Sequence, residues 1–181
     1  DRSNIRFNPE LAPMGAIGDA GWYKMRAGVE YVPLDVELDT VSAHLRRDPE
    51  TGAALSGTGV LDFTDGSTST WNCGFDSGAV VMDLRITGTG GVINIDDFLS
   101  QNRDGSADFL YRKGGWGRGT SEEINIASAK PGAALMFEDM AAAAKDPSLR
   151  EQWMSATQRT QALLDAAWMA ALQMEQGASS S

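Results

Sequence analysis

The sequence has one cysteine, one histidine and few basic residues for its number of acids. A lone cysteine, Cys73, excludes an internal disulfide, and a lone histidine, His44, excludes a metal site built from several histidines. Fifteen lysines and arginines against 25 acids give a net charge of −10. This argues against nucleic acid as a main partner, because phosphate binding requires clustered cations. No apolar run approaches the roughly 20 residues of a membrane span, and the best stretch, near 133–144, is interrupted by Glu138 and Asp139.

What remains is the composition of a globular domain. Hydrophobic residues make up 42% of the chain and charged residues 22%, both near the average for folded proteins. A chain of 181 residues is long enough to enclose a core. We predict one domain over residues 1–175, followed by a frayed tail at 176–181. The chain opens on Asp1 without a methionine or a basic, hydrophobic leader, which we interpret as a processed or truncated product.

The pattern of apolar residues predicts one helix followed by a series of strands. Ile17, Gly21 and Met25 recur at helical spacing, so a helix is predicted over about 16–31. The preceding segment, 5–9, ends at a proline and is predicted to be extended. From residue 34 apolar and polar residues alternate, as in half-buried strands. Short turns join these stretches, which predicts an antiparallel meander with strands at 41–46, 55–63, 69–75, 80–87 and 92–95.

The same alternation places the two rare side chains. His44 falls on the polar face of its strand, while Cys73 shares an apolar face with Trp71 and Phe75. We therefore interpret His44 as a surface residue and Cys73 as a thiol of the core.

The last third of the chain returns to a helical pattern. Ser148 and Glu151 have the spacing of a capping box, which predicts Ser148 as the N-cap of the final helix. Because strands and helices are segregated along the sequence, we predict an α+β fold: an open, mostly antiparallel β-sheet with helices packed on one face. The predicted elements here are weak strands at 109–112 and 124–127, a flexible loop at 113–119, and helices at 136–144 and from 148 to about 173.

Several segments, in the same order, resemble the C-terminal domain of the glucose–fructose oxidoreductase/inositol dehydrogenase (Gfo/Idh/MocA) family. The resemblance covers nearly the whole chain and depends on the ordered set rather than on any one piece. The segments are residues 5–9 (IRFNP), 15–23 (GAIGDAGWY), 57–66 (GTGVLDFTDG), 86–91 (ITGTGG), 136–140 (MFEDM) and 157–166 (TQRTQALLDA).

The resemblance implies half of a two-domain enzyme. In such enzymes an N-terminal domain binds NAD or NADP, and the C-terminal domain closes the substrate site and often forms the oligomer. The implied reaction is hydride transfer between the nicotinamide and a sugar-like hydroxyl or carbonyl. It uses a lysine of the N-terminal domain and an Asp-x-x-x-His or Asp-x-x-x-Tyr pair, matched here by Asp19 and Tyr23.

The spacing of Asp19 and Tyr23 is physically suited to that role. Residues i and i+4 share one helical face. The tyrosine would exchange a proton with substrate if a nearby cation favoured its ionised form, and the aspartate would orient a substrate hydroxyl or the lysine. Gly15, Gly18 and Gly21 would allow the cofactor or substrate to approach closely. The alternative is purely structural: an acid favoured at a helix N-terminus, next to an amphipathic aromatic side chain.

The cofactor-binding half of the family pattern is missing from this sequence. No strand is followed by G-x-G-x-x-G, and no Glu-Lys-Pro occurs. Gly88–Gly91 lies between two predicted strands and is interpreted as a turn, and the glycines at 114–119 open no helix. The chain alone is therefore expected to bind no dinucleotide and no metal, and to contribute at most half of an active site.

Two functions remain open at this stage. The first is the substrate-binding and oligomerising half of an NAD(P)-dependent, sugar-type oxidoreductase. The second is an enzyme-derived, non-catalytic accessory subunit of a larger complex, organellar and membrane-associated, in which Asp19 and Tyr23 are relics. Both predict association, as a homo-oligomer or in an assembly, because a lone domain of this kind would expose an apolar patch.

Overall fold

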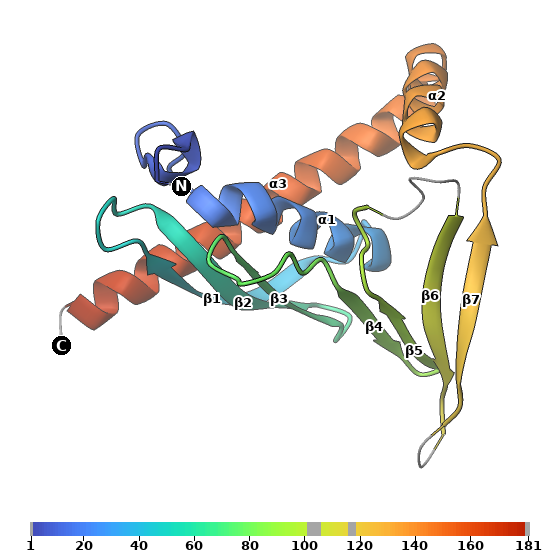
Figure 1. Ribbon diagram of the computed structural model, residues 1–181, viewed down its shortest axis with the longest axis horizontal. Helices are drawn as coiled ribbons and strands as arrows, with labels where there is room; N and C mark the ends of the chain where they lie inside the picture. The colour runs from blue at the N-terminus through green and yellow to red at the C-terminus, as the bar shows by residue number, and fades with distance from the viewer. Residues whose placement is uncertain (1, 101–105, 116–118, 180–181) are drawn as a thin grey trace. The chain divides into compact units, whose positions relative to one another are not determined.

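A computed structural model describes residues 2–100, 106–115 and 119–179 (Figure 1). The described chain divides into two compact units. Unit 1 contains residues 1–76 and 150–181, and unit 2 contains residues 77–149.

Unit 1 combines a three-stranded sheet with helices. The chain forms a 3-10 turn η1 (Ile5–Phe7), a π-helical turn η2 (Ile17–Gly21) and the helix α1 (Trp22–Tyr31). It then enters the strands β1 (Leu38–Arg47), β2 (Ala54–Phe63) and β3 (Thr68–Gly74), which pair antiparallel in that order. The long helix α3 (Pro147–Ser179) returns to this unit from residue 150.

The core of unit 1 lies between one face of this sheet and the helices. Ala43, Leu61 and Trp71 face it from β1, β2 and β3 and are buried. Ile17 of η2 and Leu164 of α3 belong to the same buried cluster, so the helical layer covers a single face (Figure 1). The predicted α+β class, with antiparallel strands and helices on one face, is confirmed.

Arg159 of α3 connects this layer to the segment between α1 and β1. Its guanidinium donates hydrogen bonds of 2.6 Å to the backbone carbonyls of Pro33 and Val36, and it stacks over the ring of Phe63 at 5.8 Å. Because these carbonyls lie in irregular backbone, the side chain satisfies acceptors that no strand or helix pairs.

Unit 2 is a four-stranded antiparallel meander with one helix. Its strands pair in chain order. The meander predicted over 41–95 is divided between β3 and β4, which belong to different sheets. The weak strand predicted at 109–112 lies within a full strand of eight residues. The strand predicted at 80–87 begins only at Leu84, and Val80 before it is 85% exposed. The elements are β4 (Leu84–Gly88), β5 (Gly91–Ile95), β6 (Ser106–Lys113), β7 (Ser121–Ala127) and α2 (Gly132–Lys145).

Three local predictions were wrong. The segment 5–9 is not extended throughout, because Asn4 caps a 3-10 turn by accepting a 3.0 Å hydrogen bond from the Arg6 amide. The N-cap of α3 is Asp146 rather than Ser148: its carboxylate accepts from the Ser148 amide at 2.9 Å and from the Ser148 hydroxyl at 2.7 Å, with Pro147 at the first helical position. The same helix continues to Ser179, beyond the predicted end near residue 173 and into the predicted tail, of which 180–181 lie outside the described residues.

Candidate functional site

The predicted helix over 16–31 is present but begins with an irregularity at the predicted site. Residues 17–21 form a π-helical turn, and α1 follows directly from Trp22. Asp19 lies in the π-helical turn and Tyr23 in the first turn of α1. Single π-helical turns inserted in α-helices occur frequently at functional sites, so the irregularity coincides with the residues that the resemblance singled out.

Glycine allows this turn to lie close to the sheet. Gly15 has φ +47°, and a Cβ placed there would lie 2.4 Å from the backbone oxygen of Ala54. A Cβ at Gly18 would lie 2.9 Å from Cβ of Met14, and one at Gly21 would contact Cys73 and the core. Gly15 and Gly18 therefore make room for the protein's own packing, and they also line the cavity described below.

Arg6 binds Asp19 through both carboxylate oxygens. Its Nε donates to Oδ2 at 2.7 Å and its Nη2 to Oδ1 at 3.0 Å, a geometry that fixes the plane of both groups. The two side chains are 45% and 40% exposed, so the pair lies at the surface, accessible to a ligand. The 3-10 turn η1 positions Arg6, and it is anchored in turn by Phe7, which packs against Phe75 with ring centroids 5.9 Å apart.

Tyr23 lies near the same cation. The pKa of Arg6 is raised, mainly by its hydrogen bond to Asp19 and by the charge of that carboxylate, and to a smaller extent by Tyr23. Tyr23 is 46% exposed. The structure thus pairs Asp19 with the guanidinium of Arg6, whereas the sequence suggested a lysine from elsewhere. Tyr23 follows on the next turn, without a contact to this pair. Sequence reasoning missed Arg6, although it lies in the first segment of the resemblance.

A cavity of about 350 Å³ opens beside the Arg6–Asp19 pair. Apart from this pair its walls are apolar or backbone, so a ligand there would meet one charged edge and a hydrophobic surround. Tyr23 is not among the lining residues, which are Ile5, Arg6, Ala12, Pro13, Met14, Gly15, Gly18 and Asp19.

The two remaining predictions about rare side chains are consistent with the structure. His44 is exposed on β1, on the face of the sheet away from the helices. Cys73 lies below η2, and burial raises the pKa of its thiol from 9.0 to about 11. Neither belongs to the Arg6–Asp19 cavity.

Metal-ligand clusters and glycine-rich turns are the features of the described residues that bear on a metal ion or a dinucleotide. They contain no group of three or more His, Cys, Asp or Glu side chains that could hold a metal ion. Gly88 pairs with Gly91 in the hairpin between β4 and β5, so this glycine-rich turn opens no helix. The glycines at 114–119 lie between β6 and β7, and positions 116–118 fall outside the described residues. No helix in the described part of the chain is long and apolar enough to cross a membrane.

Comparison with solved structures identifies the fold. The 3-ketoreductase KijD10 from Actinomadura kijaniata, in complex with NADP and TDP-benzene, aligns with 93% of this chain at a TM-score of 0.77 and 19% identity. Aldose-aldose oxidoreductase from Caulobacter crescentus aligns with 96% at 0.70 and 16% identity, and a putative oxidoreductase from Erwinia carotovora with 91% at 0.62 and 19% identity. No family model matches the sequence.

The alignments cover only part of these enzymes. The chain spans about half their length, 49% of KijD10 and 50% of the other two. At these identities the similarity establishes the fold, and it is the fold that the resemblance to a Gfo/Idh/MocA C-terminal domain predicted.

Proposed function

We propose that this chain is the substrate-binding and oligomerising half of an NAD(P)-dependent, sugar-type oxidoreductase. The observation that carries the proposal is the bidentate Arg6–Asp19 pair beside Tyr23, at a cavity, on a fold whose solved neighbours include a 3-ketoreductase bound to NADP and an aldose-aldose oxidoreductase. By the resemblance to Gfo/Idh/MocA enzymes, the cofactor would be held by an N-terminal domain.

Within such an enzyme each residue of the site has a specific task. The oxygen of a sugar carbonyl gains negative charge during reduction, and a tyrosine hydroxyl is able to donate a hydrogen bond and then a proton to it. Arg6 would stabilise that charge, because a guanidinium stays protonated throughout. Asp19 holds the guanidinium in one plane through two hydrogen bonds, which limits the number of ways in which the substrate oxygen can meet it.

The test is the activity of the natural protein, in its full length from the source. We expect NADPH-dependent reduction of keto sugars, and a fall of about 10²–10⁴-fold in kcat for Tyr23→Phe, the usual contribution of a general acid. The matched control is Tyr111→Phe, because the Tyr111 hydroxyl donates to the Gly90 carbonyl in unit 2 and the substitution keeps the ring that contributes to the sheet face of that unit. Unchanged turnover in both Tyr23→Phe and Asp19→Asn would contradict the proposed role of the pair.

Association of the chain is supported by an apolar face of the sheet in unit 2. The pairing of β4 to β7 places on one face a set of apolar side chains, none of them buried: Leu84, Ile86, Ile93, Ile95, Phe109, Tyr111, Ile124 and Ile126. A face of this kind usually marks an interaction site. Sedimentation velocity of the chain at micromolar concentration should therefore show a dimer or larger species, and a monomer would refute this part of the proposal.

The second candidate function is a non-catalytic accessory subunit. It is favoured by the helix α2, on which Phe137 and Met140 are 63% and 60% exposed and no described residue is buried. A native mass near the 19.3 kDa of this chain, co-purification with other proteins and no response of activity to Tyr23→Phe would favour the subunit over the enzyme.

A further inference from the structure

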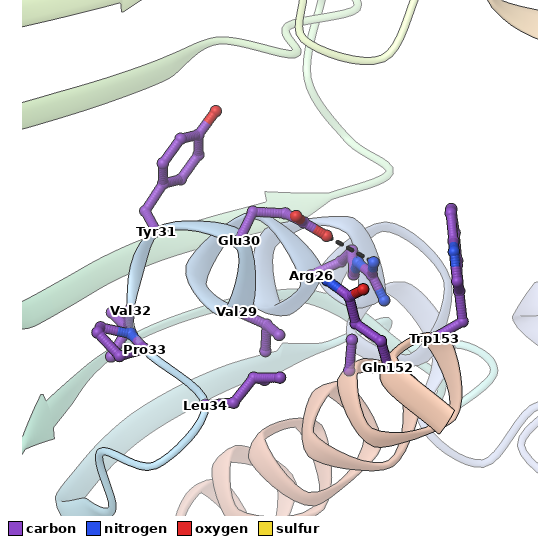
Figure 2. Close-up of a pocket in the computed structure, with 10 residues that line it drawn as sticks. Arg26, Val29, Glu30, Tyr31, Val32, Pro33, Leu34, Gln152 and Trp153 are labelled. Carbon is purple, nitrogen blue, oxygen red and sulfur yellow. Dashed lines mark ion pairs between the residues drawn. The ribbon is translucent and has the colours of Figure 1, made fainter. Parts of the chain in front are cut away.

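A second cavity, of about 450 Å³, lies between the C-terminal end of α1 and the part of α3 that belongs to unit 1 (Figure 2). Its volume is within the range of small-molecule sites. Val29 and Ala156 are buried residues of its lining, 5% and 8% exposed, and they provide an apolar floor. None of its lining residues takes part in the Arg6–Asp19 cavity.

Two aromatic side chains of the lining are largely exposed. Tyr31, the last residue of α1, is 54% exposed, and Trp153 of α3 is 45% exposed. Figure 2 shows them at opposite ends of the cavity. Aromatic side chains with one apolar and one polar part are favoured where a ligand must be both stacked and hydrogen-bonded. Burial, and secondarily the charge of Glu30, raises the pKa of Tyr31, so its hydroxyl remains a donor over the physiological range.

An ion pair lies in the middle of the cavity. Arg26 binds Glu30 at 2.5 Å across one turn of α1, and its guanidinium lies 5.7 Å from the centre of the Trp153 ring (Figure 2). Gln152 adds an amide that both donates and accepts. Donors and acceptors therefore alternate at fixed positions next to an indole, an arrangement that suits the adjacent hydroxyls of a sugar ring.

The helix places this cavity in line with the proposed reaction site. Tyr23, Arg26 and Glu30 stand at i, i+3 and i+7 on α1, positions that share one face. Seven residues of helix rise about 10 Å, which is more than one sugar ring spans. We infer that the cavity is a distal subsite that binds the second ring of a glycoside, while the ring that carries the reacting carbon lies near Tyr23.

This inference rests on the proposed function, and a binding experiment separates the two. The chain is labelled with 15N, and its tryptophan indole and arginine Nε–H signals are followed during titration with cellobiose and, separately, with glucose. We expect cellobiose to shift the indole signal of Trp153 saturably and at least about fivefold more tightly than glucose, as two rings bury more surface than one. The indole of Trp168, which packs with Arg47, should not move.

Variants show whether the cavity itself is responsible. Glu30→Gln keeps the shape but removes the charge, and it should weaken cellobiose binding about tenfold, the usual size of a hydrogen bond to a charged group. The matched control is Glu10→Gln. Glu10 is an exposed carboxylate that does not line this cavity, so the variant should bind cellobiose as the parent does. Loss of the Trp153 shift in Glu30→Gln, but not in Glu10→Gln, supports the subsite.

Two results would overturn the inference in distinguishable ways. In the first, cellobiose shifts the Arg6 Nε–H signal but not the Trp153 indole signal, or the Trp153 titration gives equal affinities for glucose and cellobiose. Either outcome would refute the distal subsite and leave the proposed function in place. The absence of any sugar-dependent shift at either position would contradict the subsite and the sugar-binding role together.

Discussion

A methyl group at Gly57 should destabilise the part of the molecule that carries Asp19. A Cβ at this position of β2 would lie 2.7 Å from Cγ1 and 2.8 Å from Cδ1 of Ile17, and 3.2 Å from the ring of Trp71. Ile17 opens the π-helical turn and is fully buried, so it has no free space into which to move. Overpacking of this kind costs about 1–3 kcal/mol, and we expect Gly57→Ala to lower the free energy of unfolding by that amount.

A double-mutant cycle shows whether the contact with Ile17 is the cause. Ile17→Ala alone should cost about 2–5 kcal/mol, because it leaves a cavity in the core. It also removes the two Ile17 atoms that the new methyl group would meet and leaves only the 3.2 Å approach to Trp71, so adding Gly57→Ala to Ile17→Ala should cost little or restore stability. The expected coupling between the two sites is about 1–3 kcal/mol.

The assay is urea unfolding followed by tryptophan fluorescence, with Trp71 in the same core. Gly88→Ala is the control, because Gly88 is also a strand glycine but a Cβ placed there would have nothing within 4 Å; its stability should stay within about 0.5 kcal/mol of the parent. The reasoning would be refuted if the effects of Ile17→Ala and Gly57→Ala on the free energy of unfolding were strictly additive. It would also be refuted if Gly57→Ala destabilised the protein no more than Gly88→Ala does.

Three further predictions concern other parts of the structure. Arg159→Met should lower the midpoint of thermal unfolding, at a cost of about 1–3 kcal/mol, because the Val36 carbonyl loses its donor while the Pro33 carbonyl keeps the Val36 amide; an unchanged midpoint would contradict the stabilising role of these hydrogen bonds. Cys73 should react slowly with iodoacetamide at pH 8 until the protein unfolds. Because its pKa is raised to about 11, the free energy of unfolding should fall as the pH rises from about 9 towards 11, by at most about 2–3 kcal/mol. Cys73→Ala should remove this fall. Asp146→Ala should destabilise α3 more than Ser148→Ala does. Hydrogen bonds from Ser148 lower the pKa of Asp146, so its contribution is complete above the unfolded pKa and is lost as the pH falls below about 4, which circular dichroism at pH 3 and pH 7 would detect.

Most of the secondary structure could be predicted from local patterns. The alternation in β1 to β3 and the short turns indicated antiparallel pairing, because both depend only on neighbouring residues. Two of the errors occurred where a side chain accepts a hydrogen bond from the backbone two residues further on, which local periodicity does not reveal. At the start of α3, Ser148 has the capping-box spacing, but Asp146 before Pro147 takes both hydrogen bonds.

The candidate site depends on both local and distant residues. Asp19 and Tyr23 were assigned through the resemblance and remain a prediction, and their spacing alone places them on adjacent turns. Arg6 is 13 residues from Asp19 in the chain, and nothing periodic connects the two positions. Its position depends on the turn η1. The proline at the end of 5–9 had instead led us to predict an extended segment there.

The sequence by itself determined the class of fold, the polar and apolar faces of the strands and the helix that carries Asp19 and Tyr23. These features depend on periodicity, which is a property of residues close together in the chain. Only the tertiary structure decided which cation meets Asp19, that the glycines around it accommodate Ala54 and the core, and that Arg26 and Glu30 face Trp153 from a helix more than 100 residues away. Contacts between distant segments depend on how the elements pack against one another. Such contacts do not produce a repeating pattern in the sequence, so they cannot be predicted from periodicity.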